Sequence, residues 1–384
     1  MVKKLFLVLV LIIAFLVIFL YQNRYNNIPE KNILLGASLP LSGINKELGK
    51  EVIEGANTYF SHINAKGGVH NKKIHLKFYD DKYEPQNTLK NIDTLINKDK
   101  VFALFGFVGT PTTKKVFSII TETHIPFIAP YTGASFLRNS NLPNIVNFRS
   151  SYKQEIEKII NFLYKTKNLT KFAIFYQNDD YGEEGYIATI SALKKRGLKL
   201  VSEGTYKRNT LSIRHALHEI KYARPEAIII VGAYKPSARF IKKSRECCFD
   251  NVIFAPISFV NSNSLVNELQ GDAKNIIFSQ TVPSYHDKNI IVSNEYIKLL
   301  QLYYPKSSPT FASFESFLAA KSVVEALKNI KGDITSKKFL YHIKHLPKQT
   351  LGSIPIEYKN TQLLNQTYLS IYKNGKFIPI DKEF

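Results

Sequence analysis

The chain has few of the residues that fasten small disulfide-rich or metal-binding domains. Only two of its 384 residues are cysteines, and these two, Cys247 and Cys248, are neighbours. No metal-ligand spacing surrounds them, so the fold is not expected to depend on disulfide bonds. Adjacent cysteines reach disulfide geometry only with strain. The sequence therefore leaves two states open for the pair: buried thiols or a vicinal disulfide.

Catalytic motifs are lacking as well. There is no Walker A loop, GxGxxG fingerprint, GxSxG elbow, HExxH or CxxC, and no nucleophile–base set is visible. The nearest approach is GFVGTPTTKK, residues 106–115, where glycines precede an expected helix start. Its free backbone N–H groups, with Thr110 and Thr112, suit a carboxylate or another anion, although a simple helix cap is the alternative. We expect a protein that is not an enzyme.

Acidic residues are scarce. The chain has 31 Asp and Glu against 52 Lys and Arg, which gives a formal net charge of +21. Such a charge suits nucleic acid or an anionic membrane. However, the lysines are dispersed, and there is no RGG run, zinc-finger spacing or block of basic helix. The sequence therefore favours a lysine-rich surface over nucleic-acid binding.

One long apolar run is present, from Leu5 to Leu20, between a Lys-Lys pair and Tyr21. A membrane-spanning helix needs roughly 17–25 residues, and a secretory signal ends in a small-residue cleavage site, which is missing here. No cysteine follows, which excludes a lipoprotein anchor. We predict a single-pass signal anchor over residues 1–21, a polar spacer over 22–32, and the rest of the chain on the periplasmic or extracytoplasmic side of the cell membrane. A cleaved signal is the alternative.

Apolar runs of strand length alternate with amphipathic helical patterns from residue 33, and the series restarts after Arg149. This alternation predicts an α/β fold with parallel sheets, and two series predict two lobes. Later helices and a C-terminal hairpin turning at Asn374-Gly375 follow. The expected strands include residues 33–40, 101–106, 125–130, 171–177 and 227–233. The expected helices include residues 50–64, 111–123, 183–196, 210–222, 236–246, 290–303, 312–330 and 335–345.

One segment contains residue types that can form a metal site or an acid/base pair. His62, His70 and His75 precede Asp80 and Asp81. The pattern puts the histidines on a helix, a turn and a strand, whereas short metal motifs place their ligands on one face. We therefore expect no metal site. The two aspartates end a strand at the sheet edge where crevices form, and can orient a loop, cap a helix or face a ligand.

Several segments, in this order, resemble the type I periplasmic substrate-binding proteins, and most closely the Leu/Ile/Val-binding group. They are GASLPLSG, INAKGGV with the following YDD, FGFVGTPTT, IPFIAPYTGA, YQNDDYGEEG and QGDA. The resemblance covers roughly residues 32–380. It implies two Rossmann-like lobes, joined by three crossings, that close over a ligand by a hinge motion. It implies no cofactor. The implied lobes are residues 33–148 with 282–350, and residues 149–281 with 351–384.

The resemblance also implies ligand contacts at the ends of the strands. The matching positions are Ser42, Gly43, Thr110, Tyr131, Thr132, Gly133, Tyr181 and Tyr234. Thr110 and Thr132 would hold a ligand carboxylate. The implied function is delivery of a small amino-acid-like solute to the permease of an ABC importer. The alternative is a membrane-anchored sensor that partners with a kinase or cyclase.

The sequence departs from the family pattern in two places. After the segment VIFAP, where amino-acid binders commonly have a carboxylate for the ligand ammonium, it reads Ile257-Ser258 with no acid nearby. At Leu48, where an aromatic residue often meets the ligand, the residue is aliphatic. An unpaired ammonium in a closed cleft is costly. A carboxylate or amide ligand without an ammonium therefore fits at least as well as a branched-chain amino acid.

Overall fold

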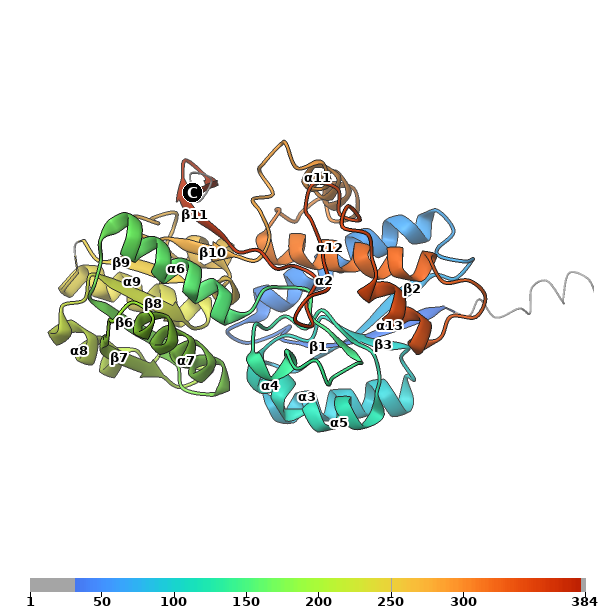
Figure 1. Cartoon of the computed structure of the whole chain (residues 1–384), viewed down its shortest axis with the longest axis horizontal. Coiled ribbons are helices and arrows are strands. Elements are labelled where there is room, and N and C mark those ends of the chain that lie inside the picture. Colours follow the sequence, from blue (N-terminus) through green and yellow to red (C-terminus); the bar gives the residue numbers. More distant parts are fainter. Residues whose placement is uncertain (1–31, 250, 381–384) are drawn as a thin grey trace, which may run out of the picture.

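The computed structural model describes residues 32–249 and 251–380, which form two lobes side by side (Figure 1). The predicted signal anchor, residues 1–21, lies outside the described residues. Within the described part of the chain, no helix is long and apolar enough to cross a membrane.

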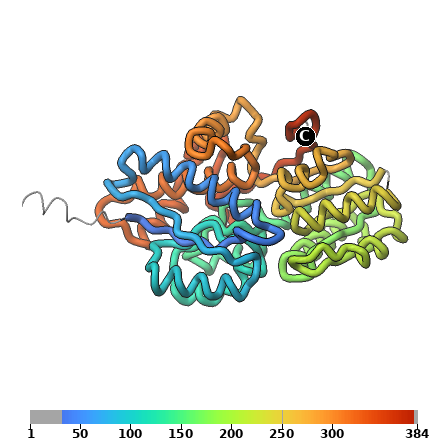
Figure 2. Tube along the Cα trace, turned by 180° about the vertical axis from the view of Figure 1, so that it is seen from behind, coloured from blue at the N-terminus to red at the C-terminus, as the bar shows by residue number. Residues whose placement is uncertain are grey.

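The first lobe is built on a five-stranded parallel sheet in the order β2-β1-β3-β4-β5. Its strands are β1 (Ile33–Leu39), β2 (Ile74–Asp80), β3 (Ala103–Phe105), β4 (Phe127–Ile128) and β5 (Ile145–Val146). Its helices are α2 (Lys46–Ala65), α3 (Pro85–Asp93) with a π-helical continuation (Thr94–Lys98), α4 (Thr110–Lys115), α5 (Phe117–Thr123), a 3₁₀ turn (Ser135–Leu137), α11 (Ile291–Tyr303), α12 (Phe311–Lys328) and α13 (Ser336–Lys344). Figure 2 shows that the early and late parts of the chain share this lobe.

The second lobe is built on a four-stranded parallel sheet in the order β7-β6-β8-β9 and a three-stranded antiparallel sheet in the order β10-β11-β12. Its strands are β6 (Phe172–Gln177), β7 (Leu200–Tyr206), β8 (Ala227–Val231), β9 (Ile253–Pro256), β10 (Phe278–Gln280), β11 (Tyr368–Lys373) and β12 (Lys376–Pro379). Its helices are α6 (Tyr152–Lys167), α7 (Asp180–Lys194), α8 (Arg214–Ala223), α9 (Tyr234–Cys247), a 3₁₀ turn (Ser258–Val260) and α10 (Ser262–Glu268).

The central strands of the parallel sheets are apolar on both faces, whereas the edge strands β2 and β7 are partly exposed. All five residues of β8 are buried, as expected for a strand covered by helices on either side. The predicted C-terminal hairpin is present, and its turn residues Asn374 and Gly375 both have the positive φ angles of a tight hairpin turn. The single helix predicted over residues 111–123 is wrong in detail. It is broken into α4 and α5 because Val116, with φ −107° and ψ 7°, leaves helical geometry.

The chain passes between the lobes near Arg149, near Thr281 and near Asn365, after which β11 joins the second lobe. Before this last crossing, the backbone of Leu363 bonds to Asn147 and that of Leu364 to Phe148, at the edge of the first lobe. These bonds favour a lobe boundary near Asn365 over the expected one at 350–351.

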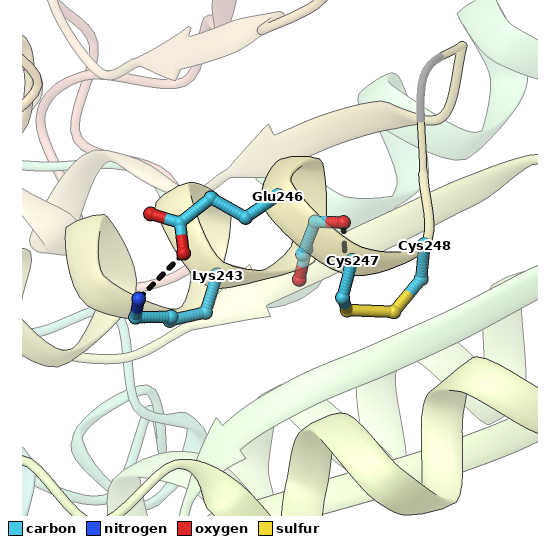
Figure 3. The surroundings of a disulfide bond; sticks show 5 residues. Lys243, Glu246, Cys247 and Cys248 are labelled. Atoms are coloured by element: carbon cyan, nitrogen blue, oxygen red, sulfur yellow. Dashed lines mark hydrogen bonds and ion pairs between the residues drawn. A yellow bond between two sulfur atoms is a disulfide. The ribbon is translucent and has the colours of Figure 1, made fainter.

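Cys247 and Cys248 form a vicinal disulfide at the C-terminal end of α9 (Figure 3). Of the two states that the sequence left open, buried thiols are therefore wrong. Cys247 is exposed and Cys248 half-buried.

Removing this disulfide is expected to have a small effect. We expect C247S/C248S to lower the free energy of unfolding by no more than about 1 kcal/mol, because a disulfide stabilises chiefly by closing a loop and this one encloses no intervening residue. Urea denaturation of the oxidised wild type and the double variant measures the difference. A loss above about 3 kcal/mol, the level of an ordinary structural disulfide, would contradict this expectation.

Candidate functional site

The candidate site lies where the C-terminal ends of the parallel strands of the two lobes meet. Loops after β3 and β4 come from the first lobe, and the starts of α6 and α7 with the turn after β9 come from the second. Side chains touch across this junction. The hydroxyl of Thr110 lies 3.3 Å from that of Tyr152, and the ring of Tyr131 contacts that of Phe259. In open α/β sheets this edge is where ligands bind.

Three buried hydroxyl groups converge at the junction. The Oγ1 atoms of Thr110 and Thr132 are 2.7 Å apart, and the Tyr152 hydroxyl lies 3.3 Å from the first and 3.2 Å from the second. Burial raises the pKa of Tyr152, so its hydroxyl stays protonated and can donate. Hydroxyl groups rotate to suit a partner, so this hydroxyl cluster can direct several O–H donors at one carboxylate.

An aromatic cluster surrounds the hydroxyl groups. Its members are Tyr83 and Tyr131 of the first lobe with Tyr152, Tyr181 and Phe259 of the second. The ring centroid of Phe259 lies 4.6 Å from that of Tyr181, 6.0 Å from Tyr131, 6.2 Å from Tyr83 and 6.4 Å from Tyr152. All five side chains are buried. The cluster offers an apolar, ring-lined surface next to the hydroxyl groups.

Several of the predicted ligand residues meet here. Thr110, Thr132, Tyr131 and Tyr181 belong to the hydroxyl or aromatic cluster. Gly133 acts through its lack of a side chain: a Cβ at this position would lie 2.5 Å from the Tyr152 ring. The glycine therefore allows Tyr152 to approach the threonines.

The other predicted ligand residues lie elsewhere. The hydroxyl of Ser42 donates to Asp80 at 2.6 Å, and Gly43 is exposed with φ +81°. Tyr234 opens α9 and is buried; burial first, and then the charges of Glu47, Glu268 and Glu51, raise its pKa. The structure does not bring these residues to the hydroxyl cluster. The ligand roles of all eight residues stay predictions.

The aspartate pair holds loops in place. Asp80 accepts hydrogen bonds from the backbone N–H groups of Leu41 and Lys82 as well as from Ser42. Asp81 is buried and accepts from the hydroxyl of Ser38 and the backbone of Tyr83. The histidines of the same segment fall on α2, a turn and β2. No group of three or more potential ligands in the described residues could hold a metal ion.

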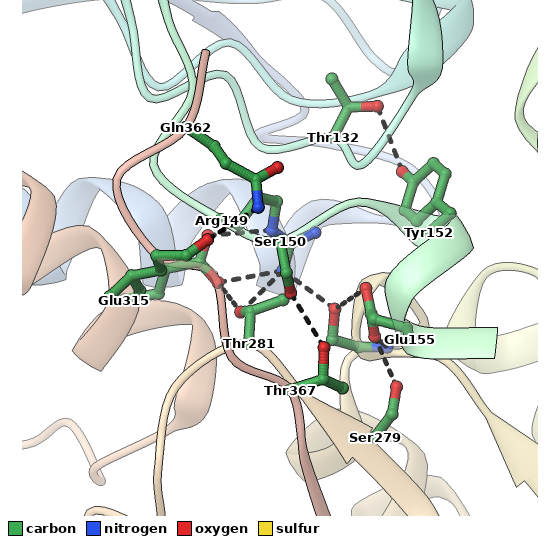
Figure 4. Close-up of polar contacts among 12 residues, drawn as sticks. Thr132, Arg149, Ser150, Tyr152, Glu155, Ser279, Thr281, Glu315, Gln362 and Thr367 are labelled. Atoms are coloured by element: carbon green, nitrogen blue, oxygen red, sulfur yellow. Dashed lines mark hydrogen bonds and ion pairs between the residues drawn. The ribbon is translucent and has the colours of Figure 1, made fainter. Parts of the chain in front are cut away.

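A buried ion pair joins the crossings (Figure 4). The Nε and Nη2 atoms of Arg149 each donate to Glu315 of α12 at 2.9 Å, and Nη2 also donates to Ser258 of the second lobe at 3.1 Å. Thr281, at the second crossing, donates to the same glutamate at 2.6 Å. Burial lowers the pKa of Arg149, but the charge of Glu315 more than offsets it, so the guanidinium stays ionised.

No acid lies next to Ser258 in the sequence, but α6 brings Glu155 to it in the fold. One carboxylate oxygen accepts from the Ser258 backbone at 2.8 Å and the other from its hydroxyl at 2.9 Å. Ser279 donates to the first oxygen as well. The acid lies 103 residues away in sequence, and no local pattern points to it.

Polar contacts also close the rim between the lobes. Arg208 pairs with Glu84 at 3.1 Å, and Asn209 donates to the same carboxylate at 2.6 Å. Lys114 of the first lobe also pairs with Asp180 of the second. Exposed ion pairs contribute little to stability, but these join lobes and so favour closure.

Glu51 of α2 bridges the lobes from a buried position. Its carboxylate accepts from the Asn261 amide of the second lobe and from the Thr310 hydroxyl of its own lobe, each at 3.0 Å. Burial raises its pKa to about 8, against the effect of these hydrogen bonds. The closed arrangement therefore holds a proton that a solvated Glu51 would release.

A pH dependence of closure follows from this proton. With the lobes apart, the pKa of Glu51 should return toward its ordinary value of 4.5. At any pH between 4.5 and about 8, closing the lobes therefore takes up a proton at Glu51. Closure becomes less favourable as the pH rises through this range. We expect ligand affinity to fall about tenfold or more from pH 5 to pH 8 by calorimetry. E51Q keeps an acceptor but cannot titrate, and should flatten the profile. An unchanged profile in E51Q would contradict this role.

A protein-family model described as "Periplasmic binding protein" matches residues 32–372. The chain belongs to this family. The resemblance to the Leu/Ile/Val-binding group is confirmed, as is the α/β fold of two lobes with parallel sheets.

Individual proteins that resemble this chain are named in the same way. A possible leucine/isoleucine/valine-binding protein from Rhodopirellula baltica SH 1 has 28% identity and a TM-score of 0.86, over 91% of this chain and 96% of that one. Leu/Ile/Val-binding protein homolog 7 of Brucella abortus (strain 2308) is 21% identical over 316 residues, 78% of either protein. An amino acid binding protein of Pseudomonas aeruginosa is 23% identical over 217 residues, 56% of this chain but only 58% of that protein's length. All three are named as binding proteins.

Proposed function

We propose that this protein is the extracytoplasmic solute-binding protein of an ABC-type importer, and that it closes its two lobes on a small amino-acid-like, carboxylate or amide ligand. The observation that carries the proposal is the convergence of Thr110, Thr132 and Tyr152 at the junction of the lobes. The family supports a location outside the cytoplasm, and the predicted anchor over residues 1–21 would hold the protein at the membrane beside its permease.

The geometry suggests how a ligand would be held. Its carboxylate would accept hydrogen bonds from the hydroxyl cluster, which the protein builds from both lobes. Its apolar part would meet the aromatic cluster, whose rings also come from both lobes. Because each group requires the lobes to be together, ligand binding and closure stabilise each other, as in a hinge motion around a ligand. The rim pairs of Arg208 and Lys114 would then complete the closed state.

A thermal-shift screen of small carboxylates, amides and amino acids tests the proposal, because a ligand that binds the folded protein raises its melting temperature by mass action. We expect carboxylates to raise it and the T110V variant to lose that response. Permease dependence is tested separately, by co-purifying the full chain from membranes of its source cell. If the chain co-purifies with a kinase or a cyclase and not with a permease, the result would favour the sensor role.

A further inference from the structure

Arg149 places a buried positive charge against the aromatic cluster. Its guanidinium carbon lies 3.9 Å from the centre of the Tyr131 ring, and the side chain is fully buried. Two of its nitrogens are held by Glu315, which fixes the plane of the group. The residue was not among the predicted ligand contacts, because it lies at a crossing and not in a loop of the family pattern.

One nitrogen of this guanidinium makes no hydrogen bond. The Nη1 atom of Arg149 is buried and has no hydrogen-bond partner among the described residues. A buried donor without a partner is costly, the more so on a charged group. Figure 4 shows Arg149 held by Glu315, with the Thr132–Tyr152 pair in the same region of the structure. Burial raises the pKa of Tyr152, and the charge of Arg149 opposes that rise.

The buried acids around the aromatic cluster already have partners. After burial, the negative charges of three glutamates raise the pKa of Tyr131, namely Glu315, Glu51 and Glu155. Glu315 accepts from Arg149 and Thr281, Glu51 from Asn261 and Thr310, and Glu155 from Ser258 and Ser279. Each of these carboxylates is thus already satisfied by internal donors and does not need a ligand ammonium as a partner.

A ring-lined cluster can also hold a cation by cation–π attraction. Here the protein's own guanidinium already lies over Tyr131. That face of the ring is therefore not open to a ligand cation. The Nη1 atom of the same guanidinium is a buried donor without a partner, and a carboxylate can accept from it whereas an ammonium cannot.

We propose that the ligand is an apolar organic acid without an ammonium group, and that Arg149 is the residue that selects it. The carboxylate would accept from the hydroxyls of Thr110, Thr132 and Tyr152 and from Nη1 of Arg149. This inference rests on the proposed binding of a ligand between the lobes, and narrows the class of that ligand.

Pairs of ligands that differ only in the ammonium group test the proposed ligand class. Calorimetry on the full chain would compare phenylalanine with 3-phenylpropanoate, and leucine with 4-methylpentanoate, since each pair differs by the ammonium group alone. We expect the acid of at least one pair to bind at least tenfold more tightly than its amino acid. Equal or tighter binding by the amino acids overturns the inference but leaves the proposed function standing. Absence of binding by every member contradicts the proposed carboxylate site itself.

Two variants test Arg149. R149M and E315Q both break the buried ion pair, but only R149M removes the free N–H donors of Nη1. The readout is the ratio of acid to amino-acid affinity, which a purely structural role would not change. We expect R149M to lower this ratio at least tenfold and E315Q to preserve it. Equal ratios in both variants would overturn the selecting role of Arg149. If R149M does not fold, R149M/E315M, which removes the guanidinium without leaving Glu315 unpaired, takes its place with the same expected ratio.

Discussion

Replacing Arg149 with methionine is expected to lower the free energy of unfolding by about 3–5 kcal/mol. The change leaves the carboxylate of Glu315 buried without its cation, at a point where two crossings and both lobes meet. Most of the expected loss of stability comes from the unpaired charge of Glu315 and less from the lost attraction between Arg149 and Glu315. An unpaired buried ion has given up its hydration without any compensating contact. Urea denaturation of R149M and the wild type measures it.

A double variant separates these two causes. In R149M/E315M both charges are replaced by apolar groups of similar length, so no ion is left unpaired. We expect this variant to recover most of the stability lost in R149M, as apolar replacement of a buried ion pair is often neutral. If R149M alone costs less than about 1 kcal/mol, the pair is not the buried contact that the structure describes.

The second large effect is expected on ligand affinity. T110V and T132V keep a branched side chain of nearly the same shape but remove the hydroxyl. Each should weaken the binding of a carboxylate ligand by about 1.5–3 kcal/mol, the range for a hydrogen bond to a charged group. The two hydroxyls are 2.7 Å apart, so the losses should not simply add in the double variant. Calorimetry with one carboxylate from the screen measures all three.

Thr112 supplies a matched control on the same helix. It is buried like Thr110, but its hydroxyl donates to the backbone carbonyls of Val108 and Gly109 and is thereby turned away from the cluster. T112V should therefore lower stability without changing ligand affinity. If T112V weakens the ligand as much as T110V, the effect comes from the loop as a whole and the role of the Thr110 hydroxyl is refuted.

The parts of the site that could be read from the sequence are those that follow directly on a strand. Thr110 comes shortly after β3, Tyr131 and Thr132 after β4, and Tyr181 after β6. Each strand is an apolar run recognisable by itself, and each parallel strand delivers the residues after it to the same edge of its sheet. Local pattern and family resemblance were therefore enough to bring these four to the junction.

Ser42 shows the limit of this reasoning. It also follows a strand, β1, but its hydroxyl is taken by Asp80 at the end of the neighbouring strand β2. The two strands pair in parallel, with Leu39 opposite Asp80, so the register brings the aspartate to the serine. Side-chain competition of this kind depends on sheet register, which the sequence of either strand alone does not encode.

The sequence by itself determined the two α/β lobes, the family and the loops at the strand ends, because strand and helix periodicity is a property of neighbouring residues. Only the tertiary structure decided what those loops meet. Arg149 reaches Glu315 across 166 residues, and Glu155 reaches Ser258 across 103. Neither pair has a local signature. The closing of the lobes buries these charges, and burial makes each acid and base depend on whichever partner the fold brings to it.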